Sequence, residues 1–112
     1  MSKRSQEDLL SDILEASTRI LSYTKGFDFK DFQNDTKTQD AVIRNVEIIG
    51  EAVSRILKLN PDFNLENARK IVDTRNWVIH GYDKVDGVVI WGIVTKHLPK
   101  LKAEVSELLE NE

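Results

Sequence analysis

Residues 35–60 read DTKTQDAVIRNVEIIGEAVSRILKLN. Their apolar residues recur at alternating steps of four and three, which is typical of an α-helix packed nearly parallel to its neighbours. Asp35 or Thr36 can cap the start of this helix. It should end before Asn60-Pro61, because the residue before a proline disfavours the α conformation. The stretch therefore predicts a long amphipathic helix with the buried seam Val42, Val46, Ile49, Val53 and Ile56.

The sequence before this helix predicts a second one that is connected to it by an aromatic segment. Two interleaved apolar rows indicate a helix from about Gln6 to Thr24, ended by Gly26. The connector from Gly26 to Asp35 is polar apart from its aromatic rings, which we expect to pin it onto the bundle. These rings are Phe27, Phe29 and Phe32.

The sequence after Asn60 predicts two more helices. One begins near Asn64 and terminates or kinks at Gly81, and the other runs from about Val85 to Leu109. Pro99 lies inside the second of these, so we expect a kink there or two shorter helices. Because no useful strand-like alternation appears, the chain is predicted to be an all-α, up-and-down bundle of four to five helices.

Composition narrows the functional classes. A chain of 112 residues with 40% hydrophobic residues predicts one domain, residues 1–112, with a buried core. The net charge of −3 argues against a surface that is basic throughout and binds nucleic acids without selectivity, but it is compatible with a local basic cleft. The absence of cysteine excludes disulfides and thiolate chemistry. No apolar segment is long enough for a membrane span, so we expect a cytoplasmic protein.

The segment 73–82, DTRNWVIHGY, does not follow the simple pattern of apolar and polar positions that is expected of a bundle helix. Arg75 stands four residues from both Ile71 and Ile79, which places a guanidinium on the apolar face of the helix. A buried charge without a partner costs several kcal/mol, so Arg75 requires a carboxylate, a phosphate or a backbone oxygen. The simplest alternative to a functional role is a structural ion pair with Glu47 or Glu51.

His80 is the second candidate in this segment, and its alternative is a hydrogen-bonded structural role. Arg75 and His80 are five positions apart, which is about 140° around an unbroken helix. They can converge on one atom only if the helix distorts at Gly81 or if two chains share the site. The other histidine, His97, is predicted to be structural. Two histidines without cysteine form no recognisable metal-ligand spacing, so we expect no metal and no cofactor.

The segment resembles the signature of HepT-like proteins of the HEPN superfamily, which is an arginine, four residues, a histidine, one residue and a tyrosine. Arg75, His80 and Tyr82 occupy these positions, and Asn76 is the polar residue that follows the arginine. Further matches cover nearly the whole chain and include Ile49-Gly50-Glu51-Ala52, Phe32 to Thr36, Ala41-Val42, Arg44, Val85-Asp86, Trp91 and Leu98-Pro99. The chain departs from many relatives at 61–66, where they have a proline-tryptophan segment that shapes the edge of the cleft.

The resemblance implies a homodimer that acts as a metal-independent ribonuclease, with two copies of the motif in a shared groove. An imidazole can take a proton from a ribose 2′-hydroxyl or donate one to the leaving oxygen, which gives His80 a role. The guanidinium of Arg75 can bind phosphate bidentately, and Asn76 would orient RNA or His80. Glu51 is a supporting residue. Arg69, Lys70 and Lys84 would form a basic groove for RNA, or else an ordinary solvated face.

Tyr82 carries a further implication of the resemblance. Relatives are usually paired with a minimal nucleotidyltransferase antitoxin, for which this tyrosine is the adenylylation target, in a type II- or VII-like toxin–antitoxin system. Added phosphate beside Arg75 would occupy the RNA phosphate site; the alternative is that Tyr82 simply packs after the helix. A non-catalytic subunit that binds nucleotide or RNA for the nucleotidyltransferase is a second interpretation. A purely structural adaptor is a third, but it leaves the motif unexplained.

Overall fold

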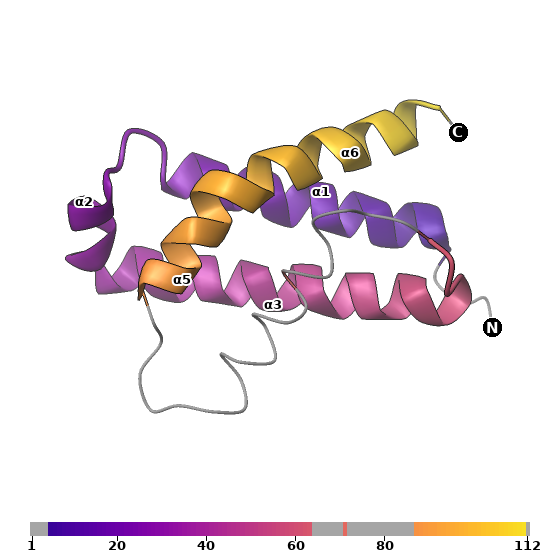
Figure 1. The fold of residues 1–112 in the computed structure, drawn as a ribbon, viewed down its shortest axis with the longest axis horizontal. Helices are drawn as coiled ribbons and strands as arrows, with labels where there is room; N and C mark the ends of the chain where they lie inside the picture. Colours follow the sequence, from indigo (N-terminus) through magenta and orange to yellow (C-terminus); the bar gives the residue numbers. More distant parts are fainter. Residues whose placement is uncertain (1–4, 64–70, 72–86, 112) are drawn as a thin grey trace.

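The computed structural model describes residues 5–63, residue 71 and residues 87–111. All the regular elements in these ranges are helical, as the sequence predicts (Figure 1). They are α1 (Gln6–Tyr23), α2 (Phe29–Gln33), α3 (Thr36–Leu59), α5 (Gly87–Gly92), the π-helical turn η1 (Ile93–His97) and α6 (Leu98–Glu110). The predicted helix after Asn64 lies outside the described residues, except for the fully buried Ile71.

Local capping sets the ends of the two long helices. The Ser5 hydroxyl accepts a hydrogen bond from the Asp8 N–H at 3.1 Å and begins α1, and Gly26 adopts a φ of +79° just after its end. Asp35 caps α3 by accepting hydrogen bonds from the Thr38 N–H at 3.0 Å and the Thr38 hydroxyl at 2.9 Å. Because α3 ends at Leu59, both predicted ends of this helix are confirmed.

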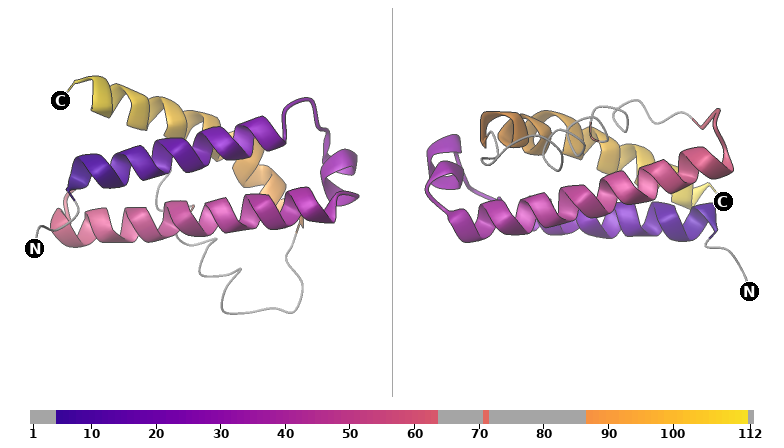
Figure 2. Two further views of the ribbon diagram at one scale, coloured as in Figure 1. Left: turned by 180° about the vertical axis from the view of Figure 1, so that it is seen from behind. Right: turned by 90° about the horizontal axis from the view of Figure 1, so that it is seen from below.

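The core lies where α1, α3 and the closing helices meet. Figures 1 and 2 show α1 and α3 side by side and antiparallel, with α6 packed on α1. The predicted seam of α3, Val42 to Ile56, is at most 1% exposed. It packs in one core cluster with residues of α1, α5, η1 and α6 such as Leu10, Ile13, Ile20, Ile90, Leu98 and Leu101. The first residues of α1 and the last residues of α6 lie at the same end of the bundle.

The aromatic connector differs from the expectation because it contains a helix of its own. Asp28 and Asp31 form a capping box around the first turn of α2, and the Gln39 amide of α3 donates to the carbonyls of Phe32 (2.7 Å) and Gln33 (2.8 Å) at its end. Five residues are too few to show helical periodicity, so only the capping box could have indicated this helix. The expected pinning is confirmed, since Phe32 is fully buried with its ring centroid 5.1 Å from that of Trp91.

The closing helix is bent at the predicted place. Pro99 has no N–H to donate, and a π-helical turn immediately precedes α6. In that turn the Leu98 N–H donates to the carbonyl of Ile93, five residues back instead of four. The result is a continuous rod, α5–η1–α6, in which α5 is turned away from the axis of α6 (Figure 1).

Candidate functional site

Most of the predicted site residues lie outside the described residues. This applies to the motif residues and to the predicted basic groove, namely Arg69, Lys70, Arg75, Asn76, His80, Tyr82 and Lys84. The convergence of Arg75 with His80 and the modification of Tyr82 therefore stay predictions. The structure does show how the frame holds both sides of the motif.

The residues that flank the motif are anchored in the core. Ile71, four positions before Arg75, is fully buried, and Ile90, eight positions after Tyr82, is 1% exposed. Gly87 lies at the junction of α2, α3 and α5, where it lines a small hollow together with Phe32, Gln39, Ile43 and Ile90. The described residues on both sides of the motif are therefore attached to the same core.

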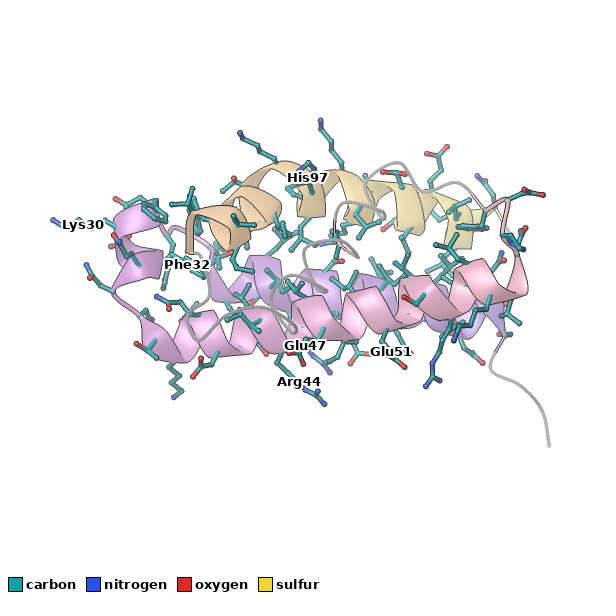
Figure 3. The ribbon with its side chains drawn as sticks, turned by 60° about the horizontal axis from the view of Figure 1, so that its bottom comes forward. Lys30, Phe32, Arg44, Glu47, Glu51 and His97 are labelled. Atoms are coloured by element: carbon teal, nitrogen blue, oxygen red, sulfur yellow. The ribbon has the colours of Figure 1, made fainter. Side chains whose placement is uncertain are left out.

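Glu51 is the predicted site residue that the structure describes. It lies on the outer face of α3 with Arg44 and Glu47 (Figure 3), and its side chain is 52% exposed. Its carboxylate is 3.1 Å from the guanidinium of Arg55, and Glu47 is 3.9 Å from that of Arg44. Glu51 is therefore an exposed carboxylate on the outer face of α3, where it pairs with Arg55 of the same helix.

The other residues of the segment 49–52 have a packing role. Ile49 is fully buried, Gly50 is buried and Ala52 is 3% exposed. This part of the resemblance therefore reflects three residues on the core side of α3, two of them small, and one carboxylate that faces outward. Ile49, Gly50 and Ala52 therefore contribute to the core of the bundle.

The remaining candidates in the described ranges are consistent with structural roles. Trp91 packs against Phe32 and, at a centroid distance of 6.5 Å, against Phe29. His97 is half-buried at the end of η1. Within residues 5–63, 71 and 87–111, no group of three or more His, Cys, Asp or Glu side chains is placed to hold a metal ion. No helix in these ranges has the length and apolar content needed to cross a membrane.

Sequence reasoning missed a second basic region outside the motif. Lys96 and Lys100 are exposed on consecutive turns of the closing rod. The signal was available in the sequence, because residues 87–103 contain three lysines and no aspartate or glutamate. The overall negative charge of the chain masked it.

Comparisons with known proteins agree with the fold and the motif. The family model described as "Ribonuclease HepT-like" matches residues 13–108. The protein named "Putative RNase MJ1380" of Methanocaldococcus jannaschii is 41% identical over 94% of this chain and 97% of its own length. The "Probable ribonuclease HepT" of Thermococcus cleftensis is also 41% identical, over 95% of this chain and 97% of its own. No solved structure gives a significant match.

An all-helical bundle that anchors an Arg-x4-His-x-Tyr segment on both sides defines the class of protein. The family match covers this segment and most of the frame, and the two relatives are matched over nearly their whole length. The chain belongs to the HepT-like ribonuclease family, which confirms the resemblance seen in its sequence.

Proposed function

We propose that this protein is a metal-independent endoribonuclease and the toxin of a toxin–antitoxin pair. The observation that carries the proposal is the motif Arg75, His80 and Tyr82 within the part of the chain that matches the HepT-like ribonuclease model. The names of the two 41% identical relatives, both ribonucleases, support the same reaction class. The anchored flanks of the motif support it too, because a reactive constellation must be held by a rigid frame.

The proposed reaction uses the 2′-hydroxyl of the RNA as the nucleophile. One imidazole takes the proton of this hydroxyl while its oxygen bonds to the adjacent phosphorus, and the bond from phosphorus to the 5′-oxygen breaks. A second imidazole donates a proton to the leaving 5′-oxygen. Arg75 binds the phosphate and offsets the negative charge that develops on it. The products are a 2′,3′-cyclic phosphate and a free 5′-hydroxyl.

A homodimer supplies the two imidazoles that this reaction needs. On an unbroken helix Arg75 and His80 project about 140° apart, so a site shared between two chains brings complementary residues together. His80 of one protomer would act as base and His80 of the partner subunit as acid, with Asn76 orienting the RNA or the imidazole. Arg69, Lys70 and Lys84, doubled by the two-fold axis, would give the groove its positive charge.

Tyr82 is the proposed point of control by a minimal nucleotidyltransferase antitoxin. In adenylylation the phenolic oxygen attacks the α-phosphorus of ATP, an O–P bond forms, and pyrophosphate leaves. The transferred AMP would place a phosphate two positions from His80 in sequence, where it competes with the RNA phosphate for Arg75. Silencing would then follow from occupation of the phosphate site and from charge repulsion.

The reaction is tested with protein expressed without any partner and shown by intact mass to be unmodified. The parent and the His80→Ala variant are incubated with total RNA in excess chelator. We expect cleavage by the parent and none by the variant, with matching circular dichroism spectra as the control for folding. Equal RNA patterns from both folded proteins would contradict the nuclease proposal and favour a non-catalytic binding subunit of the nucleotidyltransferase.

The control of the enzyme is tested by co-expression with the minimal nucleotidyltransferase and ATP. We expect the mass of the parent to increase by one or more AMP groups, the mass of the Tyr82→Phe variant to stay unchanged, and only the modified parent to lose cleavage. Modification of the Tyr82→Phe variant, or a modified parent that still cuts RNA, would contradict this part of the proposal.

A further inference from the structure

The closing rod α5–η1–α6 separates its charges by sign. Residues 87–103 carry Lys96, Lys100 and Lys102 and no acidic residue, whereas residues 104–112 carry four glutamates and no basic residue. The rod is continuous through η1, so this is a division along one structural element. The first turn of α1 is also acidic, and it lies at the end of the bundle where α6 ends.

This order of charges is the reverse of what helix stability favours. The C-terminal end of a helix carries partial negative charge and is stabilised by cations. The last turn of α6 has no basic residue and instead carries Glu107 and Glu110, while the lysines stand in the middle of the rod. A charge pattern that opposes a local stability rule is expected where function sets the sequence.

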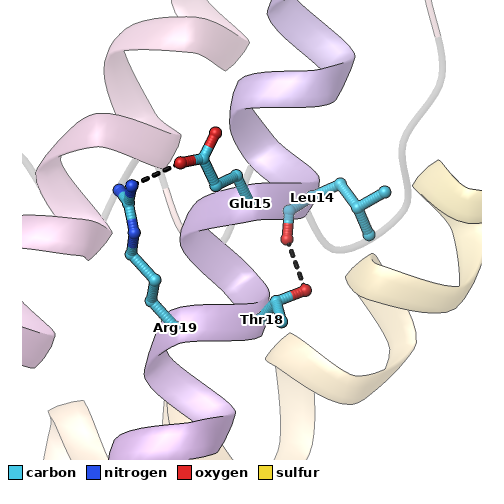
Figure 4. Close-up of polar contacts among 4 residues, drawn as sticks. All are labelled: Leu14, Glu15, Thr18 and Arg19. Atoms are coloured by element: carbon cyan, nitrogen blue, oxygen red, sulfur yellow. Dashed lines mark hydrogen bonds and ion pairs between the residues drawn. The ribbon is translucent and has the colours of Figure 1, made fainter.

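The lysines of the rod differ from the arginines in the same ranges. Each arginine there is paired with a glutamate on its own helix, as Arg19 is with Glu15 in Figure 4 and as Arg44 and Arg55 are on α3. Lys96 and Lys100 are exposed and form no salt bridge with any residue in the described ranges. Their charges are therefore available to an external anion.

Aromatic rings and a further lysine lie at the α5 end of the rod, where α2 packs against α5. The partly exposed rings of Phe29 and Trp91 are 6.5 Å apart between α2 and α5, and Lys30 projects outward at this end of the bundle (Figure 3). The hydroxyl of Thr95, which directly precedes Lys96, donates to the carbonyl of Trp91 at 2.9 Å. The turn of the rod that contains Lys96 is therefore hydrogen-bonded to the backbone of Trp91.

The acidic residues near Lys30 are engaged in capping α2. A carboxylate oxygen of Asp28 accepts from the Asp31 N–H at 2.8 Å, and one of Asp31 accepts from the Asp28 N–H at 3.1 Å. Neither is in a salt bridge with Lys30 in the described structure. Each carboxylate therefore bonds to the positive end of the short helix, which leaves Lys30 available at the surface.

We propose that Lys96 and Lys100, with Lys30 and the rings of Phe29 and Trp91, form a binding surface for single-stranded RNA. The ammonium groups would contact phosphates and the rings would stack on bases, a combination that tolerates any sequence. Gly87 is five positions after Tyr82, which limits the separation of their Cα atoms to about 18 Å. The inference rests on the proposed function and names a surface that would hold the RNA substrate.

The surface is tested by fluorescence anisotropy with a labelled 12-nucleotide RNA, in the His80→Ala background so that the RNA stays intact. The test variant is Lys96→Gln with Lys100→Gln. The matched control is Lys37→Gln with Lys58→Gln, two exposed lysines of α3. Each pair leaves 14 basic against 19 acidic side chains, so both change the net charge from −3 to −5.

We expect the test pair to weaken binding roughly tenfold or more at moderate salt, and to flatten the slope of log affinity against log salt by about 1.4. The control pair should keep the parental slope. Equal slopes for the two folded double variants, in a protein that still binds RNA, would overturn the surface. In a Trp77→Phe background, where Trp91 is the remaining tryptophan, saturating RNA should quench Trp91 emission; unchanged emission would overturn the stacking role.

Failure of this surface and failure of the proposed function give different results. Cleavage by the His80-containing protein together with equal slopes would overturn the surface alone. RNA binding with the expected difference in slope, but without cleavage by the parent, would support the surface and contradict the nuclease. If the parent neither binds nor cleaves RNA, both are overturned.

Discussion

α3 and the closing rod α5–η1–α6 are the two longest helical paths in the described chain, and they treat local helix rules differently. α3 runs 24 residues from an aspartate cap to Leu59, and both arginines on its outer face are paired with glutamates. The rod is continuous but contains a π turn, η1, just before Pro99, and its charges are divided into a basic stretch and an acidic end. The sequence of α3 therefore follows the local rules of helix formation. The rod departs from them in its π turn and in its order of charges.

The difference distinguishes α3, which supports the fold, from the rod, for which we propose a binding function. A helix that follows its local preferences needs little else to form, so α3 can serve as a rigid part of the frame. Pro99 coincides with the bend of the rod, and the RNA surface proposed above would account for the position of the lysines. Variants that exchange these properties test the distinction.

The largest expected effect is on the residue that joins the two regions. Phe32 is fully buried and its ring packs on Trp91 of the rod. Phe32→Ala should lower the free energy of unfolding by about 3–5 kcal/mol, as is usual for loss of a buried phenylalanine. Chemical denaturation measures this loss, and Phe29→Ala, at a partly exposed ring, should cost less than half as much. Equal losses would contradict the role of Phe32 as the link.

Introducing a proline into α3 and removing Pro99 from the rod compares how strongly the free energy of unfolding of each helix depends on proline. Arg44→Pro places a proline at an exposed position inside α3 and should cost about 3 kcal/mol or more. Pro99→Ala should change the free energy of unfolding by less than about 1 kcal/mol, because proline is tolerated in the first turn of a helix such as α6. A large gain from Pro99→Ala would show that the bend carries an unrelieved strain.

The cap of α3 should make part of its stability depend on pH. Hydrogen bonds from the backbone and side chain of Thr38 hold the pKa of Asp35 below its usual 3.8. A depressed folded-state pKa gives stability that is complete above pH 3.8 and is lost as pH falls through the folded value. Asp35→Ala should therefore lower the denaturation midpoint at pH 7, and the difference from the parent should shrink below pH 4. A difference that grows with acid would contradict the cap.

The smallest expected effect on stability comes from the outer face of α3. Arg55→Gln and Glu51→Gln break the same ion pair, whose side chains are 53% and 52% exposed. Each should cost about 0.5 kcal/mol or less, because exposed pairs are screened by solvent. Only Glu51→Gln should reduce RNA cleavage if Glu51 supports the motif. Equal cleavage by the two variants would remove Glu51 from the site.

Most of the described fold follows from the sequence because its signals are periodic and locally capped. The seam of α3, the end at Asn60-Pro61 and the bend at Pro99 each have a cause in one or a few residues, and the structure confirms them. α2 was missed because a five-residue helix shows no periodicity. Its support from Gln39 depends on a contact across six or seven positions, which the sequence does not reveal.

The candidate site is a different case. The Arg75–His80–Tyr82 motif could be found from its spacing, because residue type and spacing are what its chemistry requires, and the family match confirms the resemblance. Its geometry depends on helix distortion or on a second chain, neither of which periodicity specifies. The sequence also did not predict that Glu51 faces outward. A glutamate next to the buried positions of a helix can pair with an arginine on the same helix, as Glu51 does with Arg55.

The chemical ends of the cleaved RNA test the central claim most directly. If the 2′-hydroxyl attacks with His80 as base and acid, the upstream fragment ends in a 2′,3′-cyclic phosphate and the downstream fragment begins with a 5′-hydroxyl. Mass spectrometry of a short RNA cut in excess chelator distinguishes these ends, and a 2′-O-methyl group at the cleaved nucleotide should abolish the reaction. Fragments with a 3′-hydroxyl and a 5′-phosphate, made equally from the methylated RNA, would contradict the account.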